Sequence, residues 1–284
     1  GTGGEASAPA VNAAAMTNKG MEFELSYIKA WGDLKFTGRI LVSAYRNSID
    51  KLAFGIPFME KGAISIGNVV RNQKGQPMSV FYGYKVAGIF GSENEVVASP
   101  LQDGAEPGFL RYENIDKSTD WDGNQEINQE DRTVIGDPNP KCTYGIDFSF
   151  TFRHFDLSAF IYGSKGNEIY NNNLWWINFW QSFQGQKSRD LLYNSWTPSN
   201  PDASLPKASN KSNFSTNTTI NSYYVEDGSY LRLKTVQLGY SVPDKYFGIT
   251  GIKGLRIYVQ ALNLFTLTGY SGLDPELGGS DSAF

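Results

Sequence analysis

The feature that most constrains this chain is a two-residue alternation of apolar and polar side chains that persists over ten residues or more. In the clearest run, residues 142–153, every second side chain is apolar, namely Cys142, Tyr144, Ile146, Phe148, Phe150 and Phe152. Period two is the repeat of a β-strand with one apolar face and one polar face. We therefore predict an all-β chain.

Further strands follow from the same pattern. Residues 21–27 and 34–44 alternate on either side of a Trp-Gly-Asp turn, residues 155–162 follow the first run after a short turn at His154, and residues 229–242 and 255–265 complete the set. These strands are about ten to fourteen residues long, longer than is usual in soluble sheets and suited to crossing a tilted barrel wall. Tyr162, Tyr240 and Tyr258, near strand ends, are predicted to join the aromatic girdle at the membrane surface.

The connections between the predicted strands are unequal in length. Residues 48–141 and 163–222 are long, polar segments rich in Gly, Asn, Ser and Pro, whereas the other turns are short. Long loops on one rim and short turns on the other are typical of outer-membrane barrels. In the second long loop, Trp176, Phe179, Trp180 and Phe183 have the spacing of a short amphipathic helix.

Charge and motif content argue against two classes of function. The net charge is −4 and the basic residues form no run, so we expect no nucleic-acid partner. His154 is the only histidine, and the chain contains neither a phosphate-binding glycine motif nor a carboxylate pair singled out by spacing. We therefore expect that the protein is not an enzyme.

Three segments form recognisable motifs: GQPMSVFYGYKVAGIF at 75–90, DRTVIG with PNPK and YG between 131 and 145, and YVEDGSYLRLK at 224–234, continued by ALNLF at 261–265 and GYSGLDPE at 269–276. These segments resemble those of the SusC/RagA-like TonB-dependent outer-membrane transporters. The segments follow the family's order and cover most of the chain. The resemblance implies that residues 1–284 are the carboxy-terminal part of a large antiparallel transmembrane β-barrel with long extracellular loops, truncated at both ends, so that the plug domain and the final strand lie outside this sequence.

The resemblance also implies a function and a set of partners. It predicts TonB-dependent import of nutrient oligosaccharides, or of peptides as in RagA-like members, across the outer membrane. A SusD-like surface lipoprotein would cap the barrel, and the TonB complex would act through the plug. Outer-membrane lipid and the remainder of the barrel would surround these strands.

One loop has the spacing of a calcium site. In residues 120–131 oxygen-bearing side chains stand at positions 1, 3, 5, 9 and 12, with Ile127 at position 8, as in an EF-hand or dockerin-like loop. Gln125 departs from this pattern, because position 6 is ordinarily Gly. We predict a Ca²⁺ ion; the alternative is an acidic turn whose polar groups cap one another. The predicted ligands are Asp120, Asp122, Asn124, Glu126 (through its carbonyl), Asn128 and Asp131.

The aromatic residues of the second long loop offer three interpretations. Trp175, Trp176 and Trp180 could bind substrate by stacking on sugar rings, or the aromatic group could dock against neighbouring loops or a lid lipoprotein. An aromatic stripe at helical spacing also arises from packing. We retain these three residues as predicted substrate contacts.

A different class of protein is also compatible with the alternation, namely a soluble, calcium-stabilised, carbohydrate-binding β-sandwich. The two hypotheses differ in what covers the apolar faces of the strands. In a sandwich Tyr144, Ile146, Phe148 and Phe150 would point into a core between two sheets; in a transporter they would face outward in an apolar band about 25 Å tall.

Overall fold

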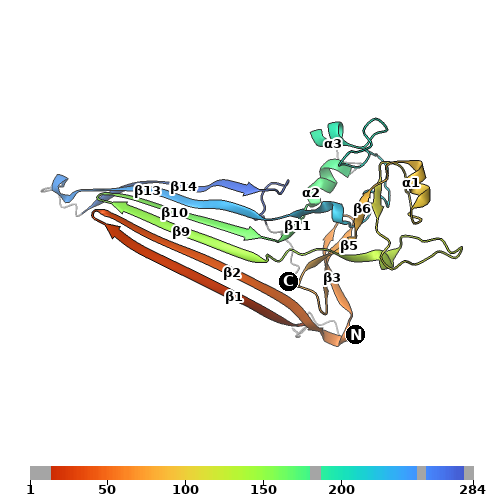
Figure 1. The fold of residues 1–284 in the computed structure, drawn as a ribbon, viewed down its shortest axis with the longest axis horizontal. Coiled ribbons are helices and arrows are strands. Elements are labelled where there is room, and N and C mark those ends of the chain that lie inside the picture. The colour runs from red at the N-terminus through yellow and green to blue at the C-terminus, as the bar shows by residue number, and fades with distance from the viewer. Residues whose placement is uncertain (1–13, 180–186, 248–253, 278–284) are drawn as a thin grey trace, which may run out of the picture.

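The computed structural model describes residues 14–179, 187–247 and 254–277. Two regions are visible in Figure 1: a long, slightly curved sheet, and a compact group of short elements at one end of it. We call the second region the cap and define it as the described parts of residues 53–141 and 166–229. No helix in the described ranges is long and apolar enough to cross a membrane.

The long sheet is an antiparallel meander of six strands in the order β1-β2-β9-β10-β13-β14. Its strands are β1 (Ala14–Trp31), β2 (Leu34–Leu52), β9 (Cys142–Phe152), β10 (Phe155–Lys165), β13 (Tyr230–Val242) and β14 (Leu255–Thr268). All six predicted strand regions and the hairpin pairings lie in this sheet. The observed strands run from 11 to 19 residues, because β1 and β2 continue to pair well beyond their alternating segments.

The register gives the sheet one apolar face and one polar face. Directly paired residues share a face, and on the central strands the row of Phe36, Phe150 and Leu157 is apolar, while the adjacent row of Thr37, Ser149 and Ser158 is polar. Phe150 is 36% exposed, and among the described elements no second sheet packs on the apolar face. The β-sandwich alternative is therefore wrong.

The cap contains short strands that were not predicted from its polar sequence. Residues predicted as a long loop fold into a four-stranded sheet, β3-β4-β5-β8, and a two-stranded ribbon, β6-β7, while β11 and β12 form a second ribbon. The strands are β3 (Phe58–Ile64), β4 (Gly67–Gln73), β5 (Val80–Tyr84), β6 (Val86–Ile89), β7 (Leu110–Tyr112), β8 (Arg132–Gly136), β11 (Glu168–Tyr170) and β12 (Val225–Asp227).

Helices in the described residues are short. They are α1 (Glu93–Ala98), α2 (Asn172–Leu174) with a π-helical turn at Trp175–Phe179, α3 (Arg189–Asn194), and 3₁₀ turns at Ala53–Gly55, Gln129–Asp131, Ser222–Tyr224 and Asp244–Tyr246. The helix predicted from the aromatic spacing is described as far as Phe179, as α2 and the π-helical turn. Trp180 and Phe183, which the same spacing included, lie outside the described residues.

Aromatic clusters and buried amides hold the cap together. One cluster contains Tyr84, Leu110, Tyr112 and Ile127, and another contains Trp175, Phe179 and Tyr224. Amide side chains satisfy backbone groups between these clusters. Gln102, for example, donates to the Leu110 carbonyl at 2.7 Å and accepts from the Tyr112 N–H at 2.8 Å.

The cap lies at the end of the sheet opposite the turns that join β1 to β2 and β9 to β10. The β9–β10 turn consists of Arg153 and His154, and Arg153 adopts a left-handed conformation (φ 54°). The connection from β13 to β14 begins at that same end (Figure 1). Short connections on one rim and elaborate ones on the other are what the sequence predicts.

Candidate functional site

The candidate site lies on the polar face of the long sheet, where the sheet meets the cap. On this face Arg232 of β13 pairs with Thr266 of β14 and Tyr162 of β10 in the register, and Tyr230 pairs with Ser164. Tyr162 therefore lies on the polar face, as does Tyr258, which pairs with Gly239. The prediction that Tyr162 and Tyr258 belong to the aromatic girdle at the membrane surface is therefore wrong. Tyr240 pairs with Phe155 on the apolar face, and its position is compatible with that prediction.

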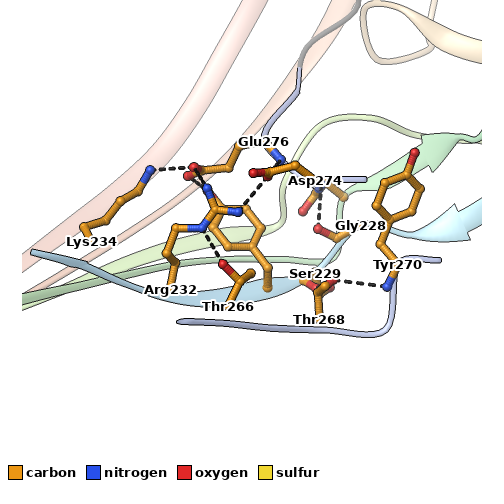
Figure 2. A network of polar contacts seen from close by, with 11 residues as sticks. Gly228, Ser229, Arg232, Lys234, Thr266, Thr268, Tyr270, Asp274 and Glu276 are labelled. Atoms are coloured by element: carbon orange, nitrogen blue, oxygen red, sulfur yellow. Dashed lines mark hydrogen bonds and ion pairs between the residues drawn. The ribbon is translucent and has the colours of Figure 1, made fainter. Parts of the chain in front are cut away.

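The segment that follows β14 crosses this polar face. We call residues Gly269–Leu277 the strap. Figure 2 shows its two acidic side chains, Asp274 and Glu276, pointing to the basic side chains Arg232 and Lys234 of β13. Its two leucines, Leu273 and Leu277, are 87% and 67% exposed.

Four charged side chains make the contact between the strap and the sheet. Arg232 donates to Asp274 Oδ1 at 2.6 Å and to Glu276 Oε2 at 2.5 Å, and Lys234 Nζ donates to Glu276 Oε2 at 2.5 Å. The hydroxyl groups of two neighbouring residues complete the network: Tyr230 donates to Glu276 Oε1, and Thr266 Oγ1 accepts from Arg232 Nε. Arg232 is 5% exposed, so the strap removes a cation from water and supplies its counter-charges.

A second contact ties the strap to the cap. Glu226 of β12 accepts from the N–H of Ser271 through Oε2 and from its hydroxyl through Oε1, both at 2.7 Å. Asn171, which is buried, donates from Nδ2 to Glu226 Oε1 at 2.7 Å. The strap is therefore anchored to the cap near its start and to the sheet near its end.

The strap borders a cleft of about 480 Å³ on the polar face. The cleft is lined by Pro138, Pro140, Thr143, Tyr162, Ser164, Asn167, Tyr230, Pro275 and Glu276. The rings of Tyr162 and Tyr230 lie 6.1 Å apart, and the Lys234 ammonium lies 5.9 Å from the centre of the Tyr162 ring. Aromatic faces beside hydroxyl and amide groups suit ligands that have both C–H surfaces and polar edges.

The charges of the strap are stabilised by their surroundings. Hydrogen bonding to the Arg232 guanidinium lowers the pKa of Asp274 below its ordinary value. Burial acts to raise the pKa of Glu276, but the hydrogen bonds from Lys234 and Tyr230, with the charge of Arg232, outweigh it and the pKa is lowered. Both carboxylates are therefore ionised at neutral pH.

The predicted calcium loop forms a hairpin turn whose polar groups bond to one another. Asp120 Oδ1 accepts from the N–H groups of Asp122 at 2.9 Å and Asn124 at 2.8 Å, and these contacts lower the pKa of Asp120. Gly123, and not Gln125, takes the left-handed conformation, with φ 82°. The non-glycine residue at position 6 therefore causes no backbone strain.

The last predicted calcium ligand, Asp131, points into the cap and is fully buried. Its carboxylate accepts hydrogen bonds from the N–H groups of Ile115 at 2.5 Å and Asn128 at 2.9 Å, and it closes a capping box at the turn Gln129–Asp131. Asn128 donates to Ser118 Oγ, and the Glu126 carbonyl accepts from Asn114. Over the described residues, no three His, Cys, Asp or Glu side chains converge as a metal group. A calcium ion would thus depend on at most two carboxylates, with amide and carbonyl oxygens as its other ligands, and it remains a prediction.

The structure places the predicted substrate-binding tryptophans in different settings. Trp175 is 1% exposed in the cap core, and its indole N–H donates to the Asn217 carbonyl at 2.8 Å. Trp176 is half-buried and packs edge-on against Trp175, with ring centres 4.9 Å apart. Trp180 lies outside the described residues. Of the two that are described, only Trp176 offers a partly exposed ring.

The residues of the strap contact did not stand out in the sequence as a site. Arg232 and Lys234 lie two positions apart on a strand with a polar face, which is a signal that they project together. Nothing in the sequence shows that a segment some 40 residues later returns to them. The acidic pair Asp274 and Glu276 directly after a strand is the only local hint.

Comparison with known proteins was made by sequence and by structure. No family model matches the chain. The chain is 31% identical to TonB-dependent receptor P3 of Formosa agariphila over 93% of its own length and 26% of the relative's. It is 24% identical to TonB-dependent receptor SusC of Bacteroides thetaiotaomicron over 94% of its length and 23% of the relative's.

Comparison with solved structures points to the same group of proteins. The structure superposes on a chain of the RagAB peptide importer in its closed-closed state with a TM-score of 0.73 and 26% identity, covering 94% of this chain and 28% of the other. The chain therefore spans about a quarter of the length of the relatives that it matches.

The two-faced meander of long strands, with short turns at one rim and a structured cap at the other, defines a section of an outer-membrane β-barrel receptor. Together with the matches, this geometry shows that the chain belongs to the SusC/RagA-like TonB-dependent receptors. These proteins are receptors and not enzymes. They reside in the outer membrane as β-barrels, so the apolar face of the sheet is directed to lipid and the polar face to the lumen.

Proposed function

We propose that this chain supplies part of the wall and the outer loops of a transporter that imports nutrient oligosaccharides or peptides across the outer membrane. The observation that carries the proposal is the division of the long sheet into a lipid-facing apolar side and a lumen-facing polar side that bears a cleft. The likeness to the RagAB peptide importer supports peptides as one substrate class.

The proposal includes partners that lie outside this chain. A SusD-like lipoprotein would cover the barrel at the cap, and TonB would act through a plug domain in the remaining three quarters of the receptor. The RagAB importer is the structural match that supports a two-component assembly. The elaborate cap, with exposed apolar side chains such as Val97 and Trp121, supports a covered surface at this rim.

The lumen cleft gives the proposal a local test. Tyr162 and Tyr230 line it beside Thr143, Ser164 and Asn167, so a sugar ring or a peptide segment would find both ring faces and hydrogen-bonding groups there. We propose that these side chains contact substrate during import. Trp176 remains a second predicted contact, in the cap.

The experiment is uptake by the native bacterium. A strain that lacks the whole receptor is complemented with the full-length gene, and import of labelled oligosaccharides and labelled peptides of graded length is measured with TonB intact and deleted. We expect TonB-dependent uptake of one of the two classes, and slower uptake with Tyr162→Ala. Equal uptake by the deletion strain and the complemented strain for every compound would contradict the proposal.

A further inference from the structure

The strap is the one segment of the described chain that contacts both the sheet and the cap through side-chain charges on the lumen side. Its first contact is Ser271 with Glu226 of β12 in the cap, and its second is Asp274 and Glu276 with Arg232 and Lys234 of β13. It is therefore a second bridge between two regions that also meet at the end of β2, where Asn47 bonds to Asn139 and to the N–H of Met78 in the cap.

The position of the strap gives it an effect on the passage. Pro275 and Glu276 form one side of the cleft on the polar face. The acidic side chains face the wall, and Leu273 and Leu277 are largely exposed. The strap thus adds a layer of chain and two apolar side chains on the lumen side of β13.

Electrostatics explain why the strap stays in this position. Arg232 is almost fully buried beneath it and makes charge-assisted hydrogen bonds to two different carboxylates. Removing one partner of a buried ion pair leaves a charge without compensation and is strongly destabilising. The two basic and two acidic side chains of this contact have a net charge of zero. The contact therefore offers no uncompensated charge to a passing ligand.

From these observations we infer that the strap, latched by Arg232 and Lys234 to Asp274 and Glu276, narrows the lumen beside the cleft and limits the size of what passes. Arg232 is a positioning residue on this view, since it acts on the passage through the strap. The inference rests on the proposed import function for its transport consequence. The contact between the strap and β13 does not depend on that function.

The test uses the full receptor in its membrane. The mild variants Glu276→Gln and Asp274→Asn, alone and combined, remove charge and retain shape, and Arg232→Lys retains charge. Asp156→Asn is the matched control, because Asp156 pairs with Arg256 on the same face, away from the strap. Two readouts are taken from each variant: hydrogen exchange of residues 269–277, and the largest labelled oligomer or antibiotic that enters cells.

We expect the combined variant to lose exchange protection of the strap by roughly two orders of magnitude and to admit larger solutes, while the control changes neither. A second variant separates the constriction from the latch: Leu273→Ala is expected to raise the size limit and leave exchange unchanged. A charge exchange, Lys234→Glu with Glu276→Lys, is expected to restore part of what each single change loses.

The outcomes distinguish this inference from the proposed function. If exchange protection persists in the combined variant, or is lost without any change in size limit, the inference is overturned even where the wild-type receptor imports substrate. If the wild type imports neither class of compound, the import function fails, and antibiotic passage still decides whether the strap limits size. Loss of barrel assembly in the combined variant leaves Leu273→Ala as the deciding measurement.

Discussion

The long sheet and the cap satisfy their backbone polar groups in different ways. In the sheet, adjacent strands pair in continuous ladders, and side chains are left free to divide between an apolar and a polar face. In the cap, irregular backbone is satisfied by buried side chains such as Gln102 and Asn217. The sheet is therefore a repeating structure that tolerates changes that preserve polarity, while the cap depends on individual residues.

The largest effect expected from this difference is in the cap core. Trp175→Ala removes a fully buried ring and the N–H that serves the Asn217 carbonyl, and a change of this kind costs about 3–5 kcal/mol. We expect rapid proteolysis of the cap, with the barrel still running as a folded species in unheated gels. Trp176→Ala is the control. A stable cap that has merely lost substrate affinity would show that Trp175 serves binding.

The next effect tests the two faces of the sheet. Phe148→Arg puts a charge on the lipid face and is expected to cost about 2–4 kcal/mol if it lies near the bilayer midplane. Ser149→Arg, the adjacent residue on the polar face, is expected to cost much less. The measurement is the fraction of receptor that folds into lipid vesicles in a urea titration. Equal losses for the two variants would refute the assignment of the faces.

The third effect concerns calcium. It tests whether a bound metal ion stabilises the cap in addition to the buried amide side chains. Calcium at one hundred times its dissociation constant would stabilise the loop by about 2.7 kcal/mol. We expect slower exchange of residues 118–128 on adding Ca²⁺, and loss of that response in Asp122→Asn. Asp122 suits this purpose because its side chain is exposed, whereas Asp131→Asn would disturb the cap with or without metal.

The smallest effect is the response of the strap to acid. The pKa values of Asp274 and Glu276 are lowered in the folded protein, so the stability that they contribute is present at neutral pH and is lost as pH falls below the ordinary carboxyl range and through those lowered values. We expect exchange of residues 269–277 to accelerate in that range in the wild type. Glu276→Gln should show a weaker response, and an identical pH profile in both would contradict the assignment.

Sequence reasoning succeeded where side-chain polarity repeats. The alternation in residues 142–153 fixed a strand, its two faces and, through the short turn at Arg153 and His154, its partner. It failed where neighbours come from distant parts of the chain. The role of Arg232 depends on a carboxylate 42 residues away, and Tyr162 was assigned to a membrane girdle because a strand-end tyrosine does not reveal which face it occupies without the register.

The candidate metal loop shows a third limit. Its spacing in the sequence is that of a ligand set, but Asp131 turns inward to bond N–H groups of the preceding segment, Ile115 among them. A ligand pattern read from spacing assumes that every side chain points to one centre. That assumption holds only where no backbone donor competes for the carboxylate.

The length of the first hairpin has a consequence for where transport begins. Eighteen residues of β1 extend about 60 Å at 3.3 Å per residue, and at a 45° tilt they rise about 40 Å, compared with an apolar band of about 25 Å. Toward the cap the outward positions change accordingly, with Lys19 opposite Arg46 and Thr17 opposite Ser48. This end of the wall therefore stands in water, and on the proposed import function a molecule that enters at the cap is shielded from sideways escape before it reaches the depth of the bilayer.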